Sequence, residues 1–242
     1  MDAISQPVHK TIIFLHIEKT AGSTLSDLIA MGHDPAQVLR IGTTTQLIQT
    51  LSQTSDKRYT AILGHFFYGI HLFGLTYHPY GYYTMLRDPV DRLISQYYYI
   101  KRASNHHLHK ILNEKNISLE EFALTNQHAN QHIIRLGYHI HRNGNSFKIR
   151  HSGDDILKTA KHTLVNLVKH FGIFEYFDES IHRLSILLGK PIKHIPMKNV
   201  SNNRASVEDL DRSTLNTIRD RNALDILLYK YAKRVFESQK IP

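Results

Sequence analysis

Four short apolar runs along the chain have the composition of β-strands. Each is rich in β-branched or aromatic residues, and each is followed by a turn or by a helical pattern. The runs are TIIFLHI (11–17), YTAILGHF (59–66), YGYYTML (80–86) and FGIFEYF (171–177). We therefore expect strands at these four positions.

Between the strands, apolar residues recur with helical spacing, and two helix starts carry clear capping signals. One helix begins after Gly22, with leucine and isoleucine residues on one face. Asp88 and Pro89 form a favoured N-cap and first helical position, and Ser118 with Glu121 matches a capping box. Further helices are predicted over 44–54, 155–170 and 213–237.

The alternation of strands and helices predicts an α/β fold with a mostly parallel central sheet flanked by helices. Ligands of such sheets bind beyond the carboxyl ends of the strands. Lys19, His65 and Arg87 all lie at or just past the end of a predicted strand. These three side chains are therefore the first candidates for a functional site.

The composition is that of a globular protein with an excess of positive charge. The chain has 242 residues, of which 41% are hydrophobic and 21% charged, and its formal net charge is +9. This excess favours anionic partners, but it does not separate a nucleotide from an acidic glycan, a nucleic acid or a membrane surface. The absence of cysteine excludes disulfides and cysteine-based zinc sites.

The N-terminal segment does not have the pattern of a secretory signal. An acidic residue and a proline come first, and the apolar run that follows is too short. No segment approaches the roughly 20 apolar residues of a membrane-spanning helix. We therefore expect a cytoplasmic protein without a membrane span.

The first motif is the loop after the first strand, in FLHIEKTAGSTLSDLI (14–29). Lys19 precedes the glycine and Ser23, whereas a nucleotide-triphosphate P-loop has its glycines first and its Lys-Ser/Thr last. Backbone N–H groups from Ala21 to Thr24 would face an anion at a helix start. An N-cap at Ser23 beside a solvated lysine is an alternative interpretation.

The second motif is YYTMLRDPVDRLISQYYYIKR (82–102). Arg87 ends a predicted strand, and Ser95 lies about two turns into the following helix. The planar guanidinium suits a phosphate, and the serine hydroxyl lies on the same side. Alternatively, Arg87 caps a carboxyl group such as that of Asp88 or Asp91. Of the tyrosines at 97–99, at least one should belong to the core, because consecutive residues spread around a helix.

Together, the lysine-first loop and the downstream RDPxxRxxSxYYY segment resemble the sulfotransferases that use 3′-phosphoadenosine-5′-phosphosulfate (PAPS). The similarity is greatest to the carbohydrate branch that contains the heparan and uronyl 2-O-sulfotransferases and their bacterial relatives. It is strong over 10–102 and weaker over 160–189 and 222–236. The resemblance implies a P-loop-NTPase-like three-layer fold that needs no divalent metal.

The same resemblance implies a single domain over 1–242. Its donor-binding core would comprise about 10–102 and 155–237, with an acceptor-facing excursion over about 103–154. In that family, the residues matching Arg87 and Ser95 hold the 3′-phosphate. The loop that grips the 5′-phosphosulfate corresponds to Lys19, Thr20, Ala21, Gly22, Ser23 and Thr24.

Two further positions follow from the resemblance. His65, in the segment ILGHFFYGIH, matches the family's catalytic base, and a neutral imidazole is suited to take a hydroxyl proton near pH 7. Leu63 stands where glycosaminoglycan members can have a second histidine. In KNVSNNR (198–204), Arg204 would close over the cofactor's phosphate, supported by Asn199 and Ser201, although an ordinary polar loop is the alternative.

Glu18 departs from the family pattern, which usually reads Pro-Lys-Thr at this point. A negative charge beside the phosphosulfate pocket would weaken binding unless it points away. Because neighbouring residues alternate on an extended chain, we expect Glu18 to face the side opposite to Ile17 and Lys19.

The remaining histidines are weak signals, since the chain has 18 of them. His16 is expected to form hydrogen bonds within the strand ends. Metal binding would need further ligands with fixed geometry, so we favour a basic acceptor surface. The histidines concerned are His106, His107 and His109, and the pair His128 and His132.

The predicted function is transfer of a sulfuryl group from PAPS to a hydroxyl, most simply that of a saccharide. His65 would deprotonate the acceptor, and Lys19 would stabilise charge on the bridging oxygen. An ATP-dependent P-loop kinase is disfavoured by the lysine-first order. A basic module that binds nucleic acid or another polyanion is disfavoured because the motifs lie at strand ends rather than on a continuous basic stripe.

Overall fold

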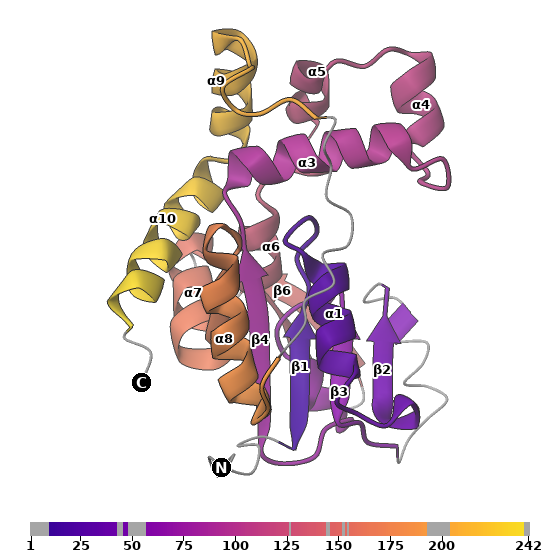
Figure 1. Ribbon diagram of the computed structural model, residues 1–242, viewed down its shortest axis with the longest axis vertical. Helices are drawn as coiled ribbons and strands as arrows, with labels where there is room; N and C mark the ends of the chain where they lie inside the picture. The colour runs from indigo at the N-terminus through magenta and orange to yellow at the C-terminus, as the bar shows by residue number, and fades with distance from the viewer. Residues whose placement is uncertain are drawn as a thin grey trace.

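A five-stranded sheet forms the centre of the computed structural model, which describes residues 10–42, 46–47, 57–125, 127–143, 146–151, 153, 155–192 and 204–239 (Figure 1). Every neighbouring pair of strands is parallel, so their carboxyl ends lie at one edge. The α/β fold predicted from the sequence is confirmed. In spatial order the strands are β2 (Val38–Ile41), β3 (Ala61–Gly64), β1 (Thr11–Leu15), β4 (Tyr80–Leu86) and β7 (Lys169–Ile173).

Three of the predicted strands lie where they were expected, and the fourth is displaced. β4 coincides with the predicted segment, whereas β1 and β3 are shorter than predicted. β7 begins at Lys169, because residues 174–177 leave the sheet through the 3-10 helix η4 (Phe174–Tyr176). β2 was not predicted, since its sequence VLRI is short and is partly exposed at the edge of the sheet.

Helices cover both faces of the sheet, and the alternation of side chains along β1 shows how the faces are built. Ile12 and Phe14 pack in one core with α1 and α8, while Ile13 and Leu15 pack in a second core on the other face. On the first face lie α1 (Gly22–Ala30) and α8 (Phe177–Leu188). On the second lie α6 (Gln131–Gly137), α7 (Ile156–His162), the π-helical η3 (Thr163–Val168) and α10 (Ala223–Ser238).

A third group of helices lies beyond the carboxyl ends of the strands, where α3 crosses the sheet (Figure 1). The Asp88 carboxylate accepts hydrogen bonds from the first turn of α3, and Ser118 with Glu121 forms a complete capping box. Both predicted helix starts are therefore confirmed. The group comprises α3 (Pro89–Arg102), α4 (His109–Glu114), α5 (Leu119–Leu124) and α9 (Arg212–Arg221).

The segment over about 103–154, expected to be an acceptor-facing excursion, contains more regular structure than its composition indicated. Besides α4, α5 and α6, it forms an antiparallel hairpin of β5 (Tyr138–Asn143) and β6 (Ser146–His151). The hairpin joins the rest of the fold where the Ile140 N–H donates to the Tyr68 carbonyl at 2.7 Å. The 3-10 helices η1 (Pro35–Gln37) and η2 (Ile70–Phe73) lie before β2 and after β3.

Two predicted helices differ from the expectation, and a third cannot be compared. The segment 155–170 changes from α-helix to π-helix at Thr163, and 213–237 is divided into α9 and α10 at Asn222. The side chain of Asn222 is fully buried and accepts a hydrogen bond from the Asn130 N–H at 3.1 Å. This contact with the start of α6 explains the break. The helix expected over 44–54 lies outside the described residues, except for 46 and 47.

A buried polar network fixes α10 to the N-terminus of α6. The carboxylate of Asp225, fully buried, accepts hydrogen bonds from the N–H groups of His132 and Ile133 at 3.0 and 2.8 Å, and lies 3.2 Å from the His132 imidazole. Burial raises the pKa of Asp225, but His132, Arg92 and the Ile133 N–H together lower it below its ordinary value. The network therefore contains an ionised carboxylate at a helix N-terminus, where it also complements the helix dipole.

Replacing this carboxylate should destabilise the protein in a pH-dependent way. Asp225→Asn removes a buried charged acceptor, so we expect a loss of about 2–4 kcal/mol in the free energy of unfolding at pH 7. Because the native pKa is depressed, the contribution is full above the unfolded value of about 3.9 and is lost as the pH falls through the native value. Urea unfolding of wild type, Asp225→Asn and the exposed control Asp220→Asn checks this. A loss that did not shrink below about pH 4 would contradict it.

Candidate active site

The loop between β1 and α1 presents successive backbone N–H groups at the carboxyl edge of the sheet. Lys19 and Ala21 have positive φ values of 67° and 62°, a conformation that costs residues with a Cβ about 1–2 kcal/mol each. Such alternation of left-handed residues before a helix forms an anion-binding concavity. The N-cap of α1 is Ala21, which makes no side-chain capping bond, so the alternative of an N-cap at Ser23 is wrong.

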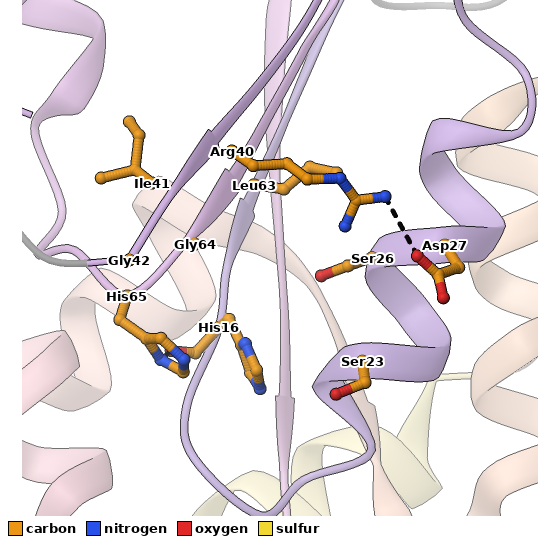
Figure 2. A pocket seen from close by; sticks show the side chains of 10 residues that line it. All are labelled: His16, Ser23, Ser26, Asp27, Arg40, Ile41, Gly42, Leu63, Gly64 and His65. Carbon is orange, nitrogen blue, oxygen red and sulfur yellow. Dashed lines mark hydrogen bonds and ion pairs between the residues drawn. The ribbon is translucent and has the colours of Figure 1, made fainter. Parts of the chain in front are cut away.

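Three loop positions have distinct roles in this turn. The Thr20 hydroxyl is buried and donates to the Ile17 carbonyl at 2.8 Å, which closes the turn. Gly22 lies against the imidazole of His16, and a methyl group at this position would overlap that ring. Ser23 is exposed at the first turn of α1, next to the cavity described below (Figure 2).

Cationic groups surround Lys19. Its ammonium group lies 4.0 Å from the centre of the Tyr99 ring. Burial lowers the pKa of Lys19 to about 8, and three guanidinium groups contribute to the shift. They belong to Arg87, Arg102 and Arg204. Their mutual repulsion favours any anion that enters between them.

Arg87 and Arg204 meet at one carboxylate. The guanidinium of Arg87 donates through Nε and Nη2 to Asp91 Oδ2, and through Nη1 to the Lys19 carbonyl at 3.0 Å. The Arg204 Nη1 donates to Asp91 Oδ1. The carboxylate-capping arrangement of Arg87 is therefore present, with Asp91 rather than Asp88. Three of the five Arg87 N–H groups are engaged in these bonds, and the other two have no partner among the described residues.

Ser95 lies one helical turn after Asp91 on α3 and is buried. The structure thus brings the predicted Arg87 and Arg204 together at Asp91, one helical turn before the predicted Ser95 on α3. Asn199 and Ser201 lie outside the described residues. Of the neighbouring tyrosines, Tyr97 is buried and donates to the Ile117 carbonyl at 2.9 Å, which confirms that one of the three belongs to the core.

His65 follows β3 and is held in one tautomer. Its Nδ1 lies 2.9 Å from the His16 carbonyl oxygen, and because a carbonyl only accepts, Nδ1 carries the proton. The lone pair is then on Nε2. Burial lowers the pKa of His65, Glu18 raises it, and Arg135 lowers it. His65 is therefore a neutral imidazole with one nitrogen available as a proton acceptor.

His16 lies directly beside His65, with the ring centres 4.1 Å apart. Burial and the neighbouring His65 lower the pKa of His16 to about 3, so its imidazole is a much weaker base than an ordinary histidine. We expected His16 to form a hydrogen bond within the strand ends. It does so through its backbone carbonyl, which accepts from His65 Nδ1, and not through its imidazole ring. Sequence reasoning did not predict that this ring would pack against Gly22.

Glu18 and Lys19 point toward different partners. The Glu18 Oε1 accepts from the Arg135 Nη2 at 2.7 Å and lies 3.5 Å from the His65 Nδ1, whereas Lys19 contacts Tyr99. The contact between Glu18 and His65 was not predicted. The contact of Glu18 with Arg135, 117 residues away, was not predicted either, because no local sequence pattern signals such distant pairs.

A cavity of about 300 Å³ opens beside the two histidines (Figure 2). Its wall combines the start of α1 with the carboxyl ends of β2 and β3. The Arg40 Nη2 donates to Asp27 Oδ1 at 3.0 Å within this wall. The lining residues are His16, Ser23, Ser26, Asp27, Arg40, Ile41, Gly42, Leu63, Gly64 and His65. The cavity is thus lined by polar and apolar groups in similar measure, and His65 lies in its wall.

The other described histidines named as candidates have separate partners. Among the described residues, no group of three or more His, Cys, Asp or Glu side chains is arranged to hold a metal ion. His132 pairs with Asp225, and His128 stacks on Phe122 with ring centres 4.8 Å apart. His106 stacks on the ring of His107, with ring centres 4.5 Å apart.

These features define an α/β protein in which a loop with two left-handed residues and a neutral histidine lie at the carboxyl edge of a parallel sheet. A family model described as the sulfotransferase family matches residues 2–232. The chain therefore belongs to the sulfotransferase family and is a transferase. A comparison with curated proteins found no match. No described helix is both long and apolar enough to span a membrane.

Gly22 should be essential for the shape of the loop. In Gly22→Ala, the new methyl group would displace the buried His16 ring or the loop itself, so we expect a loss of about 1–3 kcal/mol in stability. Gly32→Ala is the matched control, because its methyl group would meet only the flexible end of Lys190. Thermal unfolding and a crystal structure of each variant check this. Equal stability of the two variants would contradict the role assigned to the His16 contact.

Proposed function

We propose that the protein transfers the sulfuryl group of PAPS to a hydroxyl group of a saccharide, with His65 as the general base. One arrangement carries this proposal. The loop from Lys19 to Thr24 lies between a cluster of cations and a neutral histidine whose Nε2 is free to accept a proton. An anionic donor and a hydroxyl acceptor would then meet at the loop.

On the donor side, the proposal assigns the 5′-phosphosulfate to the backbone N–H groups of the loop. The loop residues that would contact the 5′-phosphosulfate are Lys19, Thr20, Ala21, Gly22, Ser23 and Thr24. Arg87, Ser95 and Arg204 would hold the 3′-phosphate. Repulsion among Lys19 and its neighbouring guanidinium groups supports this assignment, because a phosphate dianion would relieve it.

In the reaction, the acceptor oxygen attacks sulfur in line while its proton passes to His65 Nε2. The bond between sulfur and the bridging oxygen breaks, and adenosine 3′,5′-bisphosphate leaves. The Lys19 ammonium would stabilise the charge that develops on this bridging oxygen, a preorganised electrostatic contribution. His65 is suited to its role because its tautomer is fixed before the acceptor arrives.

The cavity beside His65 supports a saccharide as the acceptor. Serine hydroxyls, the ion pair of Asp27 with Arg40, and the histidines supply its polar groups, and no phenylalanine, tyrosine or tryptophan is among the described lining residues. Such donors and acceptors suit a compound with several hydroxyl groups.

The 3′-phosphate assignment predicts a strong preference between two nucleotides. Adenosine 3′,5′-bisphosphate should bind much more tightly than 5′-AMP. Arg87→Ala should remove most of this difference by weakening bisphosphate binding about 10- to 150-fold, since hydrogen bonds to charged groups contribute roughly 1.5–3 kcal/mol. Isothermal titration calorimetry measures both affinities.

Two variants sharpen this experiment. Arg87→Lys keeps the charge but loses the planar fork, so it should recover only part of the preference. Arg219→Ala, at an exposed position of α9, should bind both nucleotides like the wild type. Equal affinity of the wild type for the two nucleotides would remove the assignment, and tighter binding of ATP with Mg²⁺ would favour a kinase.

The role of His65 predicts a loss of turnover without a loss of donor binding. In His65→Ala, turnover should fall by about 10²–10⁴, the usual contribution of a positioned general base, while bisphosphate affinity stays unchanged. Because burial lowers the pKa of His65, the wild-type rate should persist through the ordinary value of about 6.5 and fall only at lower pH.

Sulfation rates across pH, with saturating donor and acceptor, check this prediction. The control is His182→Ala, which removes an exposed histidine of α8. If His65→Ala keeps near-normal turnover, or loses bisphosphate affinity instead, His65 is not the base.

A further inference from the structure

We propose that Glu18, held by Arg135, is a positioning residue that orients His65 and stabilises its protonated form. This inference deepens the proposed function, and its kinetic part rests on it. The geometry places one carboxylate oxygen of Glu18 between two cationic or potentially cationic groups. Oε1 accepts from the Arg135 Nη2 at 2.7 Å and lies 3.5 Å from the His65 Nδ1.

Two acceptors therefore face the same N–H group of His65. The His16 carbonyl accepts its hydrogen bond at 2.9 Å, and the Glu18 carboxylate stands just beyond hydrogen-bond distance. The carbonyl fixes the tautomer, but it carries no net charge. When Nε2 takes a proton from the acceptor, the imidazolium gains an attraction to Glu18 that the neutral ring lacks. Glu18 therefore acts more strongly on the protonated form than on the resting form.

The ion pair of Glu18 with Arg135 is not built for maximal stability. Arginine and carboxylate groups can form two parallel hydrogen bonds, yet here a single bond joins them. Among the described residues, the buried Glu18 Oε2 and Arg135 Nε have no hydrogen-bond partner. The carboxylate is turned so that its bonded oxygen also faces His65, at the cost of the second bond. This is the geometry expected of a group that serves the histidine.

The charge of Glu18 is secured by its surroundings. Burial raises the pKa of Glu18, but Arg135 and, when it is protonated, His65 lower it to about 2, so the carboxylate is ionised near neutral pH. Around His65, the Glu18 charge raises the pKa and the Arg135 charge lowers it. His16 faces the same ring from the end of β1, and the interactions of Glu18 extend to Arg92 and His128.

Arg135 also connects the base to the segment outside the donor-binding core. It belongs to α6, and its guanidinium lies over the Phe67 ring, which follows His65 by two residues. Both ends of the pair are thus anchored, Glu18 by the loop after β1 and Arg135 by α6. The side chains that would tune the base come from two segments far apart in the sequence.

The decisive measurement is the titration of His65 by NMR, without donor or acceptor. The His65 imidazole signal is assigned by its absence in His65→Ala. In Glu18→Gln the titration midpoint should move to lower pH by about one unit, because an opposite charge within 4–6 Å shifts a pKa by about 1–3 units and Arg135 remains. In Arg135→Gln the midpoint should move to higher pH. Opposite shifts are not expected from a general loosening of the site.

Glu179→Gln is the matched control, since it removes the glutamate of another pair with arginine, Glu179 with Arg183 on α8. Its His65 midpoint should stay at the wild-type value. Circular dichroism verifies that all variants are folded. A His65 midpoint that is unchanged in both Glu18→Gln and Arg135→Gln, or that moves in the same direction in both, would overturn the inference.

Kinetics then separate this inference from the proposed function. Glu18→Gln should lower turnover by about 10- to 100-fold and move the acid limb of the rate profile to lower pH. The loss is smaller than the ~10⁴ that follows when the tautomer-setting carboxylate of a serine protease is replaced, because the His16 carbonyl remains in place. Absence of sulfuryl transfer by the wild type would contradict the proposed function. Wild-type transfer with an unaltered Glu18→Gln profile would contradict only the role of Glu18.

Discussion

The parallel pairing of β1 with β3 and β4 is the constraint on which the candidate site depends. Leu15 pairs with Gly64 on one side and with Thr84 on the other. The residues that follow these strands therefore leave the sheet at one level, and His16 comes to lie beside His65. Gly64 has a φ of 155° and lies against the Ile41 carbonyl, where a Cβ would clash. This close approach of β3 to β2 lets β3 end where His65 faces the loop after β1.

Around this edge, the charges are separated into two environments. On the α3 side, Arg87 and Arg204 share the Asp91 carboxylate, while burial and repulsion from nearby guanidinium groups lower the pKa of Lys19. On the histidine side, Glu18 and Arg135 carry opposite charges, and they act on the pKa of His65 in opposite directions. Burial makes both environments sensitive to a ligand, since charges interact more strongly where water is excluded. The backbone strain at Lys19 and Ala21 belongs to the loop that separates them.

The chain belongs to the sulfotransferase family, and under the proposed function the two environments would serve the two partners of one sulfuryl transfer. A donor with several negative charges needs fixed cations, and an acceptor hydroxyl needs a neutral base. If a base and a lysine were placed in one environment, the cation would lower the pKa of the base and weaken it. The carboxylate of Glu18 adds a negative charge on the histidine side, whereas the ammonium group of Lys19 lies against Tyr99.

The sequence by itself determined the class of fold, the main strands and the loop, because buried strands and capped helices leave local patterns of side chains. Asp88 and Pro89 marked the start of α3 without any knowledge of its surroundings. Tertiary structure alone decided the break at Asn222, whose side chain contacts Asn130 at the start of α6. It also joined Glu18 to Arg135. These contacts connect residues distant in the sequence, and the free energy of such pairs depends on burial and distance, which no local pattern contains.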